Sequence, residues 1–153
     1  MSSKTDTRYS LAVETVIAAD IRNVWDLLVN PVKTGELFWG STVESDFKVG
    51  SPIVWKGMWE GKPFEDRGTI KQVRQSSLLQ YTHWSTASST AEDEGSHNLL
   101  TFRLSQEKDG VRVVFQHENI ATKDMKEHSE PMWNQLLANM KKMAEGSGGA
   151  AAG

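Results

Sequence analysis

The stretch "HSEPMWNQLLANMKKM", His128 to Met143, decides the fold of this 153-residue chain. It belongs to a helix that we expect to begin after Thr122, a good N-cap residue. Pro131 has no backbone N–H group, so we expect a kink or a fresh helical start near Ser129–Pro131. Apolar residues share one stripe of this helix: Met125, Met132, Trp133, Leu136, Leu137, Met140 and Met143. Such a stripe needs an apolar surface to cover.

The first part of the chain predicts a strand followed by one or two short helices. Residues Tyr9–Ile17 alternate between apolar and polar, which is typical of a half-buried strand. One helical face then collects the apolar residues Ile21, Val24, Trp25 and Leu28. Asn30-Pro31 ends this helix, because proline disfavours helical geometry in the residue before it. A short, irregular helical piece is expected through Leu37–Trp39.

The middle of the chain changes to a period of two and predicts a run of strands. These strands are Pro52–Trp59, Phe64–Val73, Leu78–Trp84, Leu99–Leu104 and Val111–His117, with a short one near Thr42–Phe47. Turns are expected at Glu60–Pro63, Gln75–Ser77 and Lys108–Gly110. Short links between strands favour an antiparallel meander. A strongly twisted sheet buries one amphipathic helix across its concave face, so we predict an α+β fold with a curved antiparallel sheet around the long C-terminal helix.

Composition narrows the classes of function. The chain has no cysteine, which excludes disulfides and thiolate metal sites. It carries 17 Lys and Arg against 20 Asp and Glu, a net charge of −3, so we expect no nucleic-acid partner. Residues 1–8 are polar and no run is apolar enough for a membrane span, which predicts a cytoplasmic protein. We expect one domain over residues 9–145 and a disordered Gly/Ala-rich tail over residues 146–153.

Four stretches carry a resemblance to a known family. They are "VIAADIRNVWDLLVNP" (16–31), "FKVGSPIVW" (47–55), "GTIKQVRQSSLLQYTHW" (68–84) and "HSEPMWNQLLANMKK" (128–142). The chain thereby resembles the START-like (SRPBCC, birch-pollen-allergen-like) helix-grip superfamily, and within it the activator-of-heat-shock-protein-90-ATPase homologue family. The resemblance implies a cavity between the sheet and the long helix, and no obligatory cofactor. Members of the superfamily bind hydrophobic small molecules, act as cyclases or hydrolases, or stimulate a chaperone.

Aromatic residues are the first candidates for lining such a cavity. Those on predicted inward faces or near the opening are Trp25, Phe38, Trp39, Trp55, Trp59, Tyr81, Phe102, Phe115 and Trp133. Each of them can instead be part of a plain core, and Trp133 and Phe102 are the firmest core candidates. Phe38 and Trp39 follow the helix break and are candidates for a gate. From the long helix, Met125, Met132 and Leu136 complete the predicted cavity, although a methionine stripe is more often core.

Polar candidates are few. His117 continues the inward parity of its strand, and His83 and Tyr81 share one face of theirs, so the three side chains converge if the sheet curves as predicted. Asp66 has inward parity too, and it can act as a base or pair with an arginine at the rim. These four residues are the candidates for catalysis, while a neutral, satisfied histidine is the alternative for His117. The histidines lack the close spacing of a metal site, so we expect no metal.

The sequence therefore favours a binding protein over an enzyme. Our leading prediction is a small hydrophobic or aromatic ligand held in an internal cavity, without a cofactor. Two alternatives stay open: a chaperone partner, and an enzyme of the cyclase or hydrolase type built on His117, His83, Tyr81 or Asp66. The chain is expected to be a monomer or a homodimer.

Overall fold

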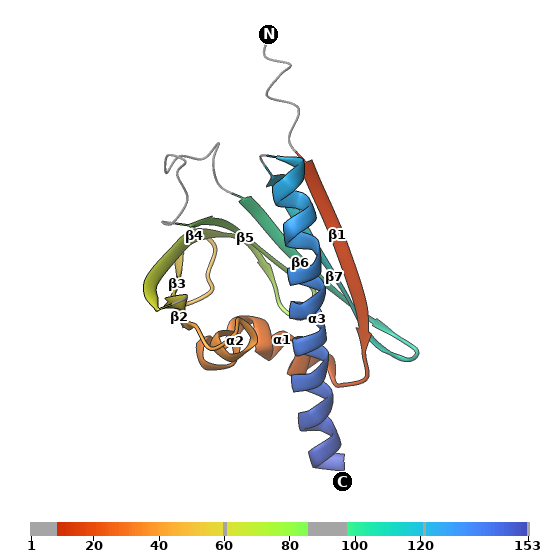
Figure 1. Ribbon diagram of the computed structural model, residues 1–153. Coiled ribbons are helices and arrows are strands. Elements are labelled where there is room, and N and C mark those ends of the chain that lie inside the picture. Colours follow the sequence, from red (N-terminus) through yellow and green to blue (C-terminus); the bar gives the residue numbers. More distant parts are fainter. Residues whose placement is uncertain (1–8, 60, 86–97, 121, 153) are drawn as a thin grey trace.

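The protein is built from one curved sheet and one long helix, with two short helices at the side (Figure 1). The computed structural model describes residues 9–59, 61–85, 98–120 and 122–152. The helices are α1 (Ile21–Val29), α2 (Pro31–Leu37) and α3 (Lys123–Ala152). The strands are β1 (Tyr9–Ile17), β2 (Thr42–Glu44), β3 (Pro52–Trp59), β4 (Lys62–Arg74), β5 (Leu78–Ser85), β6 (Asn98–Glu107) and β7 (Gly110–Ile120). The predicted α+β fold class is confirmed.

Within the described residues the strands form one sheet in the order β1-β7-β6-β5-β4-β3-β2, and each neighbouring pair is antiparallel. Strands β2 to β7 are the predicted meander, and β1 joins it beside β7. The register places Leu11 opposite His117, His117 opposite Leu100, and Leu100 opposite Tyr81. Residues directly opposite each other share a face of the sheet, so this row of side chains points to one side.

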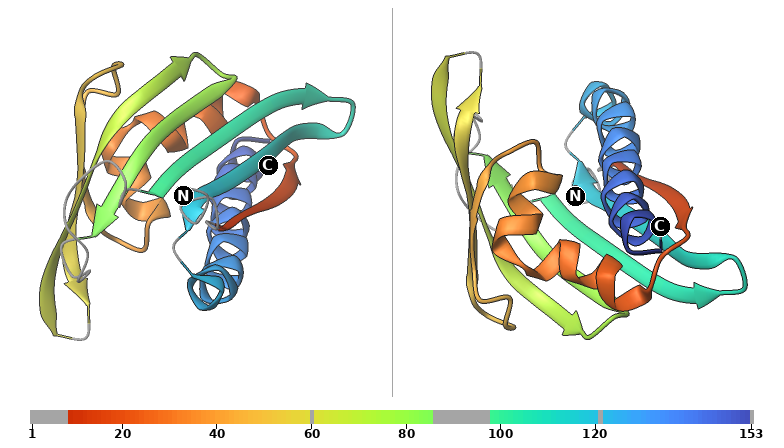
Figure 2. Two further views of the ribbon diagram at one scale, coloured as in Figure 1. Left: turned by 90° about the horizontal axis from the view of Figure 1, so that it is seen from above. Right: turned by 90° about the horizontal axis from the view of Figure 1, so that it is seen from below.

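Helix α3 lies across the concave face of the sheet, as predicted (Figures 1 and 2). Its buried side chains recur at spacings of three and four: Trp133, Leu136, Leu137, Met140 and Ala144. They meet the inward-facing side chains of the sheet, among which Phe102, Phe115, Val113 and Val111 have no exposed surface. The apolar stripe of α3 therefore forms one side of the core.

Helices α1 and α2 share a single capping residue. The N–H group of Asn30 donates to the carbonyl of Asp26 at the end of α1, and its side-chain oxygen accepts from Val32 N–H at the start of α2. Pro31 is the first residue of α2, where its fixed φ suits a helix and its missing N–H costs nothing. The second helix therefore begins earlier than the irregular piece predicted through Leu37–Trp39.

Two turns differ from the prediction in detail. Strand β4 already begins at Lys62, so the turn predicted over Glu60–Pro63 is shorter, and Pro63 pairs with Met58. At the β6–β7 hairpin Glu107 pairs with Gly110, which leaves Lys108 and Asp109 as the loop. A Cβ atom at Gly110 would lie 2.3 Å from the carbonyl oxygen of Ile17, so the end of β1 requires this glycine.

Helix α3 is longer and more continuous than predicted. Thr122 is its N-cap, since its hydroxyl accepts from Met125 N–H at 3.1 Å. The helix continues through Pro131, so the predicted fresh start is wrong. Pro131 has no N–H group to donate to the carbonyl of Glu127, four residues earlier. Both residues are exposed, so water can donate a hydrogen bond to that carbonyl instead. The helix also reaches Ala152 and includes most of the tail predicted to be disordered, where an alanine run favours helix.

Candidate functional site

A cavity of about 420 Å³ lies between α3 and the inner face of the sheet. Ligand pockets in proteins typically enclose ~300–1,000 Å³, so this space is sufficient for a small organic molecule. The chain around the α2–β2 turn contributes Phe38, Trp39 and Ser41 to its wall, and α3 contributes Ser129, Met132 and Trp133. The sheet contributes Trp55, Phe64, Asp66, His83, Leu100 and His117, from β3 to β7. Apolar and aromatic side chains make up most of this wall.

The alternation of strand residues explains which side chains reach the cavity. Trp55 on β3 lies opposite Asp66 on β4, so both point inward. Phe64 precedes Asp66 by two residues and shares its face. His83 follows the inward-facing Tyr81 by two residues on β5. Three consecutive strands, β3 to β5, thus direct side chains toward one space under α3.

Aromatic rings form a continuous lining. The Trp55 ring lies 6.1 Å from that of Phe38, 5.4 Å from that of Tyr81 and 5.2 Å from the His83 imidazole, between ring centroids. These are ordinary distances for favourable contacts between aromatic rings. Burial raises the pKa of Tyr81, whose side chain is 1% exposed. The wall behind Trp55 is therefore buried and aromatic.

His117 is fixed in one chemical form by Trp133. The indole Nε1–H of Trp133 donates to His117 Nδ1 at 2.9 Å. An indole nitrogen can only donate, so Nδ1 must be the unprotonated nitrogen of the imidazole. Burial, and next the nearby His83, lower the pKa of His117 to about 4, so the ring is neutral at pH 7. A neutral ring with a bare Nδ1 carries its proton on Nε2.

Asp66 and His83 form the one carboxylate–imidazole contact among the described side chains of the cavity wall. His83 Nε2 lies 2.9 Å from Asp66 Oδ2, and the two side chains are 26% and 20% exposed. The arginine partner considered for Asp66 is not observed, since the neighbouring Arg67 pairs with Glu65. The arrangement brings Asp66, His83 and His117 to the same cavity, while Tyr81 lies behind it.

The described part of the chain offers neither a cluster of metal ligands nor a membrane-spanning helix. No group of three or more His, Asp or Glu side chains is placed there to hold a metal ion. No helix in it combines the length and the hydropathy needed to cross a lipid bilayer.

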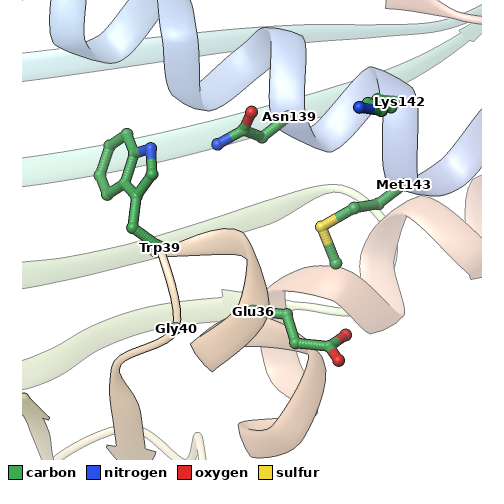
Figure 3. Close-up of a pocket in the computed structure, with 6 residues that line it drawn as sticks. All are labelled: Glu36, Trp39, Gly40, Asn139, Lys142 and Met143. Atoms are coloured by element: carbon green, nitrogen blue, oxygen red, sulfur yellow. The ribbon is translucent and has the colours of Figure 1, made fainter.

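An open groove of about 610 Å³ lies on the other side of Trp39. Its wall comprises Glu36, Trp39, Gly40, Asn139, Lys142 and Met143 (Figure 3). Figure 3 shows Trp39 extending from the α2–β2 connection toward α3, and Met143 extending from α3 toward α2. Trp39 is 51% exposed, has a φ of 57° and lines both the groove and the cavity. Its position is consistent with the predicted gate.

The predicted cavity residues separate into three groups. Seven line the cavity: Phe38, Trp39, Trp55, His83, His117, Met132 and Trp133. Five are buried in the core instead: Trp25, Tyr81, Phe102, Phe115 and Leu136. Met125 is 48% exposed and lies outside the cavity wall, because the first turn of α3 lies near the end of the sheet (Figure 1). The side chain of Trp59 lies outside the described residues.

Four residues of the wall were not predicted from the sequence: Ser41, Phe64, Leu100 and Ser129. Phe64 and Leu100 have the inward parity of their strands, and this signal was available for both. Ser41 and Ser129 carry no such signal, since small polar residues occur in turns and on helices throughout the chain.

Comparison with solved structures places this architecture among known proteins. The solution structure of ChR145 from Cytophaga hutchinsonii is 42% identical, with 91% of this chain and 95% of that chain covered and a TM-score of 0.79. The Aha1 dimer from Colwellia psychrerythraea is 17% identical, with 90% and 96% covered and a TM-score of 0.72. A protein of unknown function from Staphylococcus aureus is 12% identical, with 92% and 95% covered and a TM-score of 0.75. A search of curated proteins found no match.

The family itself is identified by sequence. The model of the family "Activator of Hsp90 ATPase homolog 1-like protein" matches residues 18–145, which span α1 to the middle of α3. This agrees with the resemblance carried by the four stretches between residues 16 and 142. The chain belongs to the family of Activator of Hsp90 ATPase homolog 1-like proteins.

Proposed function

We propose that the protein binds an apolar or aromatic small molecule in the cavity between α3 and the concave sheet. The observation that carries the proposal is the cavity itself, about 420 Å³ of space bounded by Phe38, Trp55, Phe64, Leu100 and Trp133. Protein interiors are close-packed with few voids larger than a water molecule, so a space of this size is distinct from ordinary packing.

The wall favours an apolar guest. A ligand that leaves water for this space gains about 25 cal/mol for each Å² of apolar surface that is buried. The thioether of Met132 lies at the mouth, 41% exposed, and unbranched Met side chains adapt to ligands of different shape. Trp39, the predicted gate residue, lines the same cavity.

A neutral fluorescent probe tests the proposal. N-phenyl-1-naphthylamine should bind the wild-type protein with a stoichiometry of one and should raise its melting temperature, because a ligand that binds only the native state stabilises it. Met132→Arg puts a long charged side chain at the mouth and should weaken binding roughly tenfold or more, since a charge is costly to bury beside an apolar guest.

The matched control is Met125→Arg. Met125 is an exposed methionine of the same helix that lies outside the cavity wall, so this variant makes the same chemical change without touching the site. It should bind the probe as the wild type does. Absence of saturable binding to the wild type, or an equal loss in both variants, would contradict the proposal.

Family membership supports a second candidate, partnership with a chaperone of the Hsp90 class. The exposed apolar side chains Val32, Val49 and Met58 lie away from the cavity wall and are available to a protein partner. A purified Hsp90 whose ATPase rate rises on addition of this protein would support this candidate. The increase should survive Met132→Arg and be lost with Met58→Glu; an unchanged ATPase rate would contradict it.

A third candidate is catalysis in the same cavity, supported by the Asp66–His83 pair at 2.9 Å. An imidazole oriented by a carboxylate is a common arrangement for a general base. The test is a screen of ester and lactone substrates, in which any turnover should fall by at least roughly a hundredfold in His83→Ala. Turnover that is unchanged in His83→Ala and His117→Ala would rule this arrangement out as the source.

A further inference from the structure

Two buried nitrogen atoms of the cavity wall have no hydrogen-bond partner among the described residues. They are Nε1 of Trp55 and Nε2 of His117. The two side chains are 3% and 6% exposed, and both line the cavity. Native proteins rarely leave buried polar atoms without a partner, because such an atom gives up its hydrogen bonds to water and gains none in return.

Both atoms are hydrogen-bond donors. An indole nitrogen carries a hydrogen and has no lone pair to offer, so Trp55 Nε1 can only donate. His117 Nδ1 already accepts the hydrogen bond from Trp133, which leaves the imidazole hydrogen on Nε2. The wall therefore presents two N–H groups that require an acceptor.

The charges in the wall favour an acceptor that is neutral. Asp66 and His83 satisfy each other at 2.9 Å, and no Lys or Arg is among the described residues that line the cavity. A carboxylate ligand would therefore bury its charge without a cation and close to the carboxylate of Asp66, which is unfavourable. A carbonyl oxygen has no such cost.

We propose that the cavity selects apolar ligands that carry a neutral hydrogen-bond acceptor, such as a ketone or ester carbonyl, with Trp55 and His117 as the specificity-determining residues. This inference rests on the proposed function and adds the chemical class of the ligand. Both nitrogen atoms have essentially no exposed surface, so a bound acceptor contacts them only when the side chains that cover them move aside.

Four rigid tricyclic compounds of similar shape provide the test. 9-Fluorenone carries a carbonyl, fluorene a methylene group, carbazole an N–H donor and fluorene-9-carboxylate a negative charge. Their affinities are measured by displacement of N-phenyl-1-naphthylamine at pH 7. Fluorenone should bind roughly tenfold more tightly than fluorene, the value of one or two well-placed hydrogen bonds, and carbazole and the carboxylate should bind no better than fluorene.

Variants assign the effect to residues. Trp55→Phe and His117→Leu each remove one donor, and in each the ratio between fluorenone and fluorene affinities should fall severalfold. Met132→Leu changes the wall without removing a donor, so it should alter both affinities alike and keep the ratio. His117→Leu also leaves the Trp133 indole N–H without its acceptor, so a second measurement uses the wild-type protein. In imidazole ¹⁵N NMR, the Nε2–H resonance of His117 should shift on addition of fluorenone and not on addition of fluorene.

The outcomes separate this inference from the proposed function. If neither the probe nor any of the four compounds binds, both fail; if the probe binds and fluorenone does not displace it, only the acceptor preference fails. If fluorene and fluorenone bind equally well, or if carbazole or the carboxylate binds best, the cavity binds ligands but the acceptor preference is wrong. A preference for fluorenone that persists unchanged in Trp55→Phe and His117→Leu would overturn the assignment of these two residues.

Discussion

Acidification should destabilise this protein through one buried side chain, His117. Its pKa is lowered from 6.5 to about 4 in the folded protein, chiefly by burial. Between these two values the unfolded chain binds a proton at this site and the folded chain does not, so the free energy of unfolding decreases as the pH falls through this window. The difference between 6.5 and about 4 corresponds to about 3 kcal/mol of stability, because a tenfold change in proton affinity is worth about 1.36 kcal/mol.

Most of this loss occurs well above the pH at which carboxylates titrate. The His117 imidazole is half-protonated at pH 6.5 in the unfolded chain and near pH 4 in the folded protein. About 2 kcal/mol of the free energy of unfolding is therefore already lost at pH 5. Protonated His117 would have a donor on Nδ1 facing the Trp133 indole N–H, 2.9 Å away in the neutral form. Burial and the repulsion between these two donors both disfavour the protonated form of His117.

Urea denaturation from pH 4 to pH 8 measures the effect, with His117→Gln as the reference. Glutamine does not titrate and can offer an oxygen to Trp133, so the difference between the two curves isolates the imidazole from other ionisable groups, including Glu145 and Glu107, whose pKa values are lowered. The difference should be constant above pH 7 and change by about 2 kcal/mol down to pH 5. Parallel curves over this range would refute the burial and neutrality assigned to His117.

Three further predictions concern packing and access. A Cβ atom at Gly68 would lie 1.7 Å from the Thr82 carbonyl oxygen, so Gly68→Ala should lower the free energy of unfolding by at least about 2 kcal/mol. Gly146 has open space around it, so the control Gly146→Ala should be neutral or stabilising. Equal free energies of unfolding for the two variants in urea titration would contradict this. Phe102 has no exposed surface, so Phe102→Ala should cost about 3–5 kcal/mol in the same assay, and a loss below 1 kcal/mol, by the same scale, would mean that it is not core. Trp39→Ala opens the wall shared by cavity and groove, so stopped-flow mixing should show faster association and dissociation of N-phenyl-1-naphthylamine; unchanged rates would remove Trp39 as the gate.

The spacing of apolar residues was sufficient to predict most of the helices and strands, because each of them buries one face. The stripe of α3 from Trp133 to Met140 and the alternation of β7 from Val111 to His117 both follow directly from burial. The continuation through Pro131 could not be read from the sequence, because it depends on the affected carbonyl being exposed to water.

The candidate site was harder to predict, for a physical reason. Phe102 and Trp55 have the same inward parity, yet one is core and the other lines the cavity, because their depth is set by packing between distant elements. Parity identified His117, but its tautomer depends on Trp133, sixteen residues away on another element. The tautomer that determines the chemistry of the wall therefore becomes evident only in three dimensions.

Methyl NMR of the six methionines gives the most direct test of the account, because they sample different surroundings in one wild-type protein. Met132 lines the cavity, Met143 lines the outer groove, and Met58 and Met125 are exposed elsewhere. With [¹³C-methyl]methionine and saturating 9-fluorenone, intermolecular NOEs should reach the Met132 methyl and be absent from Met58 and Met125. Saturable binding with NOEs to Met143, Met58 or Met125 and none to Met132 would show that the guest does not lie between α3 and the sheet.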